Sequence, residues 1–269
     1  MSKLKANKAD LRVSLRKKMI TLAAKTSTHY PHIGSCLSCI DILIQVMIYE
    51  MSPADKFILS KGHAALALYV VLSRLGKIPK KVLEKTYFQE GTQFGLHTPS
   101  SLKEDIPLAT GSLGHGLSFA AGLAKGYELT GKDTRYVYCM MSDGECNEGA
   151  VWEAAQFASA NRLDNLIAII DRNRLQAFGA TGEVLGDAAS PAKWRAFGFD
   201  TAVCDGHNLA EIAAEVKKFK KIKNNKPHIL ICNTIRGKGI KAIENRIESN
   251  YTAMVGKTLD QALKDIGKL

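Results

Sequence analysis

The chain has 269 residues, of which 46% are hydrophobic and 23% charged, and its formal net charge is +11. These proportions are typical of a folded globular protein and exclude a disordered chain. The lysines are spread along the chain without interleaved aromatic residues, so the positive charge indicates a solvated surface or anionic small molecules, and we expect no nucleic-acid partner.

The lengths of the apolar runs and the positions of the cysteines indicate where in the cell the protein is expected. No apolar run approaches the roughly 18 residues of a membrane span, and residues 1–15 lack the apolar core of a signal peptide, so we expect no membrane association and a cytoplasmic location. The six cysteines lie mostly in apolar segments, which is typical of reduced, buried thiols. Cys36 and Cys39 have redox-motif spacing, but they precede a helical run, and we interpret them as packing residues.

The first predicted element is a helix over Leu11–Ser27, whose apolar residues recur at near-helical spacing beneath a basic outer face. Pro31 and Gly34 mark the loop that follows. This loop carries His29 and His32, and Ser35 is predicted to cap the next helix.

A short buried strand, Lys56–Ser60, leads through Gly62 into an apolar helix, Ala64–Leu75. Lys61 and His63 stand between the two elements. This order places an ammonium, an imidazole and free backbone N–H groups at a helix N-terminus, which favours binding of an anion.

Residues Gln89–Thr110 form a long predicted loop that contains His97. Such loops inside compact domains are usually functional or disordered. The stretch Gly111–Gly116 then begins a helix rich in alanine and glycine, and its small residues and helix dipole favour a phosphate. It lacks the spacing and the preceding strand of a dinucleotide-binding fingerprint.

Two buried strands, Tyr136–Met141 and Leu166–Ile170, flank a predicted helix and make a right-handed βαβ unit. The polar ends of parallel strands meet at one edge of the sheet, so we expect Asp143 and Asn173 to be neighbours. Carboxylate and amide oxygens suit Mg²⁺ or Ca²⁺, and Gly144 leaves room for a diphosphate.

The remaining elements continue the alternation with a strand at Asp200–Val203, a helix at Leu209–Phe219 and a strand at His228–Thr234. The last strand ends at Arg236 in a glycine-rich turn, where open α/β sheets bind ligands. His207 is interpreted as a structural turn residue. We predict a single α/β domain over residues 1–240 with a central parallel sheet flanked by helices, and a surface tail or partner-docking segment over 241–269.

The spacing from Asp143 to Asn173 resembles the thiamine-diphosphate motif. The segments Phe57–Ala64 (FILSKGHA) and Glu148–Ala154 (EGAVWEA) resemble transketolases more specifically. This resemblance covers nearly the whole chain. It implies the diphosphate-binding half of an enzyme that moves a two-carbon ketol unit from a ketose to an aldose.

The resemblance also implies roles for individual residues. Metal ligands would be Asp143, Asn173 and the main-chain carbonyl of Leu175. Catalytic imidazoles would be His32, His63 and His97, and Glu148 would link two cofactor sites across a dimer. Contacts to the cofactor would come from His63, Gly111, Ser112, Leu113, Gly144, Glu145, Asn173 and Arg236.

Transketolases activate thiamine diphosphate with a Glu on a second domain, and full-length members are more than twice this length. No second series of βαβ units follows Ile240. We therefore expect the N-terminal subunit of a split transketolase. It would be inactive alone, would form a heterotetramer with a C-terminal subunit, and would act on a sugar phosphate or a related anion.

Three positions depart from the family pattern. His115 stands where Gln is usual, Asn250 stands at or near a usual His, and the neighbours of His32 differ from Gly-His-Pro-Gly. A donor other than the common pentose phosphates is therefore one hypothesis, and an Asn250→His variant would shift donor preference if it holds. Two alternatives stay open: another thiamine-dependent subunit, of an acyl-transferring synthase or a 2-oxo-acid dehydrogenase, or a non-catalytic subunit that keeps the fold.

Overall fold

The computed structural model describes residues 7–26, 31–102, 104–132 and 134–269. In these residues the chain forms a five-stranded parallel sheet in the order β1-β2-β3-β5-β4. The strands are β1 (Lys56–Leu59), β2 (Val137–Ser142), β3 (Leu166–Arg172), β4 (Asp200–Asp205) and β5 (His228–Asn233). The prediction of an α/β fold with a central parallel sheet is confirmed.

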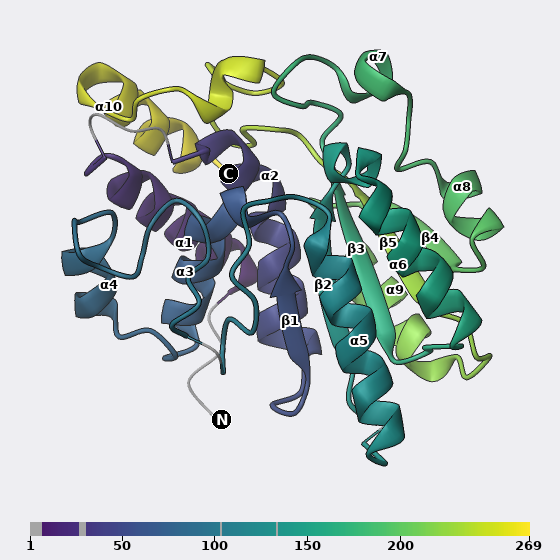
Figure 1. Ribbon diagram of the computed structural model, residues 1–269. Coiled ribbons are helices and arrows are strands. Elements are labelled where there is room, and N and C mark those ends of the chain that lie inside the picture. Colours follow the sequence, from purple (N-terminus) through teal and green to yellow (C-terminus); the bar gives the residue numbers. More distant parts are fainter. Residues whose placement is uncertain (1–6, 27–30, 103, 133) are drawn as a thin grey trace.

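Helices cover both faces of the sheet (Figure 1). The helical elements of the described residues are α1 (Lys8–Ala23), α2 (Ile33–Leu43) with its π-helical continuation η1 (Ile44–Glu50), the 3-10 turn η2 (Gly62–Ala64), α3 (Ala65–Arg74), α4 (Lys80–Thr86), α5 (His115–Leu129), the 3-10 turn η3 (Gly144–Asn147), α6 (Gly149–Ala160), α7 (Thr181–Leu185), α8 (Pro191–Ala196), α9 (Leu209–Lys221), the 3-10 turn η4 (Ile247–Asn250) and α10 (Gly256–Ile266).

Alternation along the strands creates two hydrophobic cores. Successive side chains of a strand point to opposite faces. In β2, Tyr138 and Met140 pack in the core beneath α1, α2, α3, α9 and α10. Val137, Cys139 and Met141 pack instead beneath α5, α6 and α8. Because both faces are covered, the central strands β2 and β3 read as nearly continuous apolar runs, as expected for a parallel sheet, whereas the edge strand β4 is partly exposed.

One apolar segment corrects an expectation. The 18 residues Ile33–Glu50 are long and apolar enough to cross a membrane by length and composition, so the statement that no run approaches this length was wrong. In the fold, 89% of this window is buried. Its apolar character is therefore explained by packing on every side, as for the central helix of a core.

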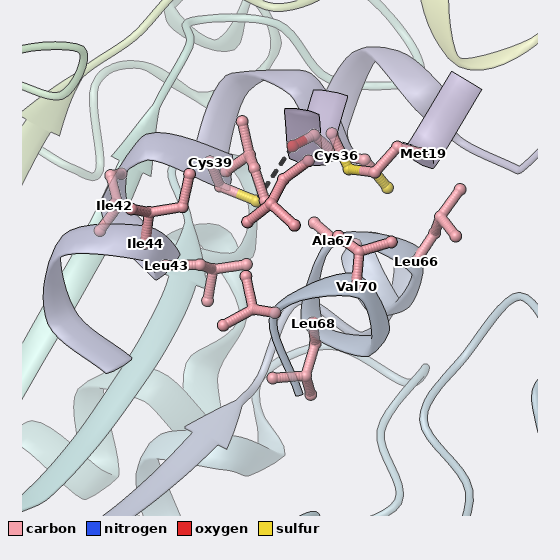
Figure 2. Packing of buried hydrophobic residues seen from close by; sticks show 14 of the residues in the cluster. Met19, Cys36, Cys39, Ile42, Leu43, Ile44, Leu66, Ala67, Leu68 and Val70 are labelled. Carbon is pink, nitrogen blue, oxygen red and sulfur yellow. Dashed lines mark hydrogen bonds between the residues drawn. The ribbon is translucent and has the colours of Figure 1, made fainter. Parts of the chain in front are cut away.

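Cys36 and Cys39 lie inside this buried helix, against Met19 and the residues of α3 (Figure 2). Both thiols are free and 0% exposed. Burial raises the pKa of Cys36 to about 11, which keeps the thiol protonated and unreactive. The interpretation as packing residues is confirmed.

The predicted elements differ from the observed ones mainly at their ends. Helix α1 ends at Ala23, whereas the prediction ran to Ser27, and the predicted loop residues 28–30, His29 included, lie outside the described residues. Residues 241–269 contain η4 and α10, and α10 packs on α1 through Ala262 and Ile266. This segment is thus part of the folded core in the structure.

Candidate functional site

A cavity of about 520 Å³ opens at the carboxyl ends of the strands. Loops that follow β2, β3 and β5 reach it, together with the start of α2 and the 3-10 turn η2 after β1. Most of the site residues singled out from the sequence meet here. The lining includes His32, Ser35, His63, Gly111, Leu113, Ser142, Gly144, Asn147, Glu148, Asn173, Leu175, Gln176, Ala177, Phe178, Val184, Leu185, Arg236, Asn250 and Tyr251.

Two imidazoles, those of His32 and His63, line this cavity, and the exposed residue His97 lies close to them outside the lining. The ring of His32 lies 6.0 Å from His63 and 6.1 Å from His97, centroid to centroid. Burial, then His97 and the charge of Arg236, lowers the pKa of His32 to about 4. Burial, then the charge of Lys61, lowers the pKa of His63 well below its usual value. Both rings are therefore neutral near pH 7 and can each donate one hydrogen bond and accept another.

The expected metal ligands lie together where β2 and β3 end. Asp143 is buried, and its Oδ2 accepts hydrogen bonds from Arg174 N–H at 2.6 Å and from the Thr181 hydroxyl at 3.1 Å. Asn173 Oδ1 accepts from the N–H of Leu175 at 3.1 Å. Burial, then the charge of Asp171, raises the pKa of Asp143 to about 6. A cation beside this carboxylate would offset both effects.

Asp171, the residue before Arg172 in β3, lies behind the site and is fully buried. Its carboxylate accepts hydrogen bonds from Ser38 at 2.6 Å, from Thr234, and from the ammonium of Lys61. Lys61 was expected to face an anion at the start of α3, and that expectation was wrong. The ammonium instead points inward and forms a buried ion pair with the Asp171 carboxylate. Lys61 and Asp171 are far apart in the sequence, so the sequence pattern around Lys61 did not indicate this contact.

Glu145 also lies behind the cavity and is 0% exposed. It accepts hydrogen bonds from the Ser60 hydroxyl, from Gly114 N–H at 2.9 Å and from Ser142 N–H at 3.3 Å. The Ser60 hydroxyl accepts in turn from Gly116 N–H at 3.0 Å. Two amides at the start of α5 are thus already bonded within the protein, and Gly111 and Leu113 of the preceding loop line the cavity.

The other predicted residues occupy different surroundings. Glu148 lines the cavity and is exposed, next to Gly114, while Ser112 is exposed and lies outside the lining. Arg236 is 2% exposed, and its guanidinium donates to the carbonyl of Gln176 at 3.2 Å. Its Nε has no hydrogen-bond partner among the described residues. A buried cation with an unused donor is suited to an anionic ligand.

Sequence reasoning missed two residues that shape the site. Gln176 lines the cavity with a buried Nε2 that has no partner in the described part of the chain. Tyr251 lies 6.0 Å from the ring of His32. Gln176 directly follows Leu175, and Tyr251 directly follows Asn250. Their closeness in sequence to these two candidate residues is the only signal that could have indicated them.

Comparison with known proteins settles the family. Residues 48–267 match the family described as transketolase, thiamine diphosphate binding domain. The chain belongs to the transketolase family. One subunit of the apulose-4-phosphate transketolase of Phocaeicola vulgatus is 34% identical over 264 residues, which cover 94% of this chain and 91% of that protein. The sequence-based resemblance to transketolases is confirmed.

The chain matches nearly the whole length of some transketolase proteins but less than half the length of others. The 6-deoxy-6-sulfo-D-fructose transketolase subunit SqwG of a Clostridium species is 34% identical, with 88% of each chain covered. Mouse transketolase is 36% identical, and the match covers 93% of this chain but 41% of that protein. The crystal structure of transketolase from Campylobacter jejuni superposes with a TM-score of 0.86, at 25% identity, over 98% of this chain and 43% of that one.

The geometry fits the cofactor of this transketolase domain. A Cβ at Gly144 would lie 2.9 Å from Gln176 Cγ, and one at Gly111 would lie 3.3 Å from the His97 ring, so side chains there would fill the cavity wall. The described residues contain no group of three or more His, Cys, Asp or Glu that could hold a metal. One carboxylate with amide and carbonyl oxygens is nevertheless a set suited to a Mg²⁺ that also binds phosphates.

Proposed function

We propose that this chain is the N-terminal subunit of a two-subunit transketolase that transfers a two-carbon ketol unit from a ketose donor to an aldose acceptor. The observation that carries the proposal is that His32 and His63 line one cavity beside the ends of β2 and β3, with the ring of His97 close to that of His32. Relatives along nearly the whole chain are transketolase subunits, which supports the assignment.

In this proposal the cofactor is held from three sides. Asp143, Asn173 and the carbonyl of Leu175 would hold Mg²⁺, or Ca²⁺ in its place, against the diphosphate. Arg236 would supply a charge and the unused Nε donor to the same anion. Gly144 and the Gly111–Leu113 loop would let the backbone approach, and Glu145 would fix that loop from behind through Gly114.

When bound, thiamine diphosphate supplies the carbon nucleophile and the electron sink that ketol transfer needs. The three histidines supply the rest of the chemistry on this chain. Charge develops on the carbonyl and hydroxyl oxygens of the sugar as the carbon–carbon bond is made or broken. Neutral imidazoles held in a partly buried cavity can donate to these oxygens or accept their protons without reorganising.

The donor is proposed to be an anionic ketose. Two of the subunits that resemble the chain are named for apulose-4-phosphate and for 6-deoxy-6-sulfo-D-fructose, and a phosphate or a sulfonate group carries negative charge. The net charge of +11 would favour encounter with such molecules. Groups that bind the far end of the sugar, and the Glu that activates the cofactor, would come from a C-terminal partner subunit, in a heterotetramer.

Reconstitution tests the proposal. The chain, its partner, and the mixture would be assayed for ketol transfer with ketose phosphates, each with Mg²⁺ and thiamine diphosphate. We expect transfer only from the mixture. Full activity from the chain alone would refute the split assignment, and consumption of pyruvate in place of a ketose would assign the complex to another thiamine-dependent class.

Calorimetry with and without EDTA would show whether cofactor binding requires the metal; a complex that binds no cofactor would be non-catalytic.

A further inference from the structure

Asn250, at the end of η4, closes the first turn of α2 from 215 residues away. Its Oδ1 accepts from the N–H of Ser35 at 2.9 Å, and its Nδ2 donates to the Ser35 hydroxyl at 3.0 Å. Asn250 is 6% exposed, and both residues line the cavity. An oxygen that accepts from the third amide of a helix does what an N-cap side chain does. Ser35 was expected to be the cap, and it is instead the residue that is capped.

The residue in the cap position is His32, and it cannot perform that task. Its backbone is left-handed, with φ 47° and ψ 44°, and its side chain makes no capping hydrogen bond. A residue other than glycine is strained in this conformation and persists in it only where its surroundings fix it. The carbonyl of His32 accepts from Ser35 N–H at 3.0 Å, which is the same N–H that Asn250 holds.

Gly34 allows η4 to come this close. A Cβ on Gly34 would lie 2.1 Å from Ser249 Oγ and 3.0 Å from Asn250 Oδ1, distances at which atoms must move. The carbonyl of Gly34 also accepts from Gly237 N–H at 2.9 Å, which ties the Arg236 turn to the same helix end. The start of α2 is thus fixed from two later segments of the chain.

We propose that Asn250 is a positioning residue for His32: by capping α2 through Ser35, it holds the left-handed backbone of His32 and so aims the imidazole into the cavity. The charged and titratable groups that face this ring are His63, His97, Arg236 and Tyr251. The proposal rests on the proposed function only where His32 is given a role in ketol transfer.

The first test uses the isolated full chain and needs no activity. The His32 imidazole would be titrated by NMR in the wild type, in Asn250→Leu, which fills the space without hydrogen bonding, and in Ser35→Ala, which keeps the capped amide. We expect the ionisation constant of His32 to change about tenfold toward its ordinary value in Asn250→Leu and by less in Ser35→Ala, because a released ring meets water.

The matched control is Asn7→Ala. Asn7 caps α1, where its side chain accepts from Ala9 N–H at 3.2 Å on the exposed end of that helix. The substitution removes a cap of the same chemistry, so we expect some loss of stability with an unchanged His32 titration. An unchanged titration in folded Asn250→Leu as well would overturn the proposal, as would an equal shift in Asn7→Ala.

The second test uses the reconstituted complex. Asn250→Leu is expected to lower kcat about tenfold or more while the affinity for thiamine diphosphate stays within about twofold, since misplacing one catalytic group affects the reaction more than cofactor binding. A parallel loss of kcat and cofactor affinity would indicate general damage and overturn the proposal. If the wild-type complex transferred no ketol unit, the proposed function would fail, whereas the NMR result would still decide the role of Asn250.

Discussion

Two glycines near this site are required because another part of the chain approaches their backbone too closely for a side chain. At the start of α5, a Cβ on Gly116 would lie 2.3 Å from Ser60 Oγ. Gly34 shows the same close approach at the start of α2, against Ser249. Neither glycine has a positive φ, so the requirement is space and not backbone conformation.

We predict that Gly34→Ala lowers the free energy of unfolding by about 1–3 kcal/mol, because the added methyl overlaps Ser249. Urea unfolding of the isolated chain measures this. Adding Ser249→Gly should recover most of the loss, since it removes the atoms that clash. Gly122→Ala in α5 is the control: no atom of the described residues lies within 4 Å of its added methyl, so we expect a gain of roughly 0.5–1 kcal/mol. Equal losses in both variants would contradict the prediction.

At the scale of elements, buried carboxylates join strands to helices. Glu145 bonds the end of β2 to the start of α5, and Ser60 bonds the end of β1 to the same helix start. The Gly111–Leu113 loop precedes α5 directly, so the position of this helix sets the position of the loop.

We predict that Glu145→Ala costs about 2–4 kcal/mol of stability, because it leaves the buried N–H groups of Gly114 and Ser142 without their acceptor. Thiamine diphosphate affinity of the variant should fall too, as the loop shifts. Thermal unfolding and calorimetry measure the two effects. Glu128→Ala, on the exposed side of α5 in a surface pair with Lys125, should change stability by less than about 0.5 kcal/mol. A Glu145→Ala protein as stable as this control would refute the prediction.

At the scale of the molecule, a second buried charge cluster joins the N-terminal helix to the rest. Asp41 in α2 accepts bidentate bonds from Arg16 at 2.8 and 2.6 Å, and bonds from Arg12 and His207. His207 Nε2 accepts in turn from Ile235 N–H at 2.9 Å. The interpretation of His207 as structural agrees with these contacts, which support the turn that carries Arg236.

This cluster predicts a loss of stability in acid. Burial favours the protonated form of Asp41, but the hydrogen bond from His207 and the charge of Arg16 outweigh it and hold the pKa of Asp41 well below its usual range. A carboxyl whose folded pKa is lower than its unfolded pKa stabilises the protein above about pH 4, and this contribution is lost as the pH falls further.

The measurement is the free energy of unfolding between pH 6 and pH 3. We expect a steep fall below about pH 4 in the wild type and a flatter profile in Asp41→Asn. At pH 6 this variant should be less stable by about 3–5 kcal/mol because Arg16 stays buried without its partner. Arg12→Ala, which removes a side chain that is 30% exposed, gives a milder variant should Asp41→Asn not fold. Asp260→Asn, at an exposed site, should follow the wild-type profile; a wild-type profile in Asp41→Asn would contradict the argument.

Much of the fold and part of the site could be predicted from the sequence. The strands were located to within one or two residues, because apolar runs flanked by polar ends mark buried parallel strands. Asp143 and Asn173 were placed together by the parallel topology alone, and Ser142 and Asp171 are paired in register beside them. Local sequence patterns are therefore sufficient to predict single strands and the residues at the ends of neighbouring parallel strands.

Contacts between distant segments could not be predicted in the same way. Lys61 bonds Asp171 across 110 residues, Glu145 bonds Gly114 across 31, and Asn250 bonds Ser35 across 215. Each of these polar groups had a plausible local role, as an anion ligand, a cofactor contact or a donor-specificity residue. All three side chains are buried, and a buried polar group needs a hydrogen-bond partner. Here the partner comes from a distant segment, which the local sequence pattern does not reveal.

The carboxylate of Asp171 has a consequence for how the site forms. It receives bonds from α2 through Ser38, from the end of β1 through Lys61 and from the turn after β5 through Thr234. Elements that share one buried anion lose their bonds together, so their fluctuations should be coupled. We predict that Ser38→Ala and Thr234→Val destabilise the chain by amounts that are not additive, with a coupling energy of about 0.5–3 kcal/mol in a double-mutant cycle. Hydrogen exchange should then show the middle of α2, around Ser38, and the end of β5 opening as one cooperative unit.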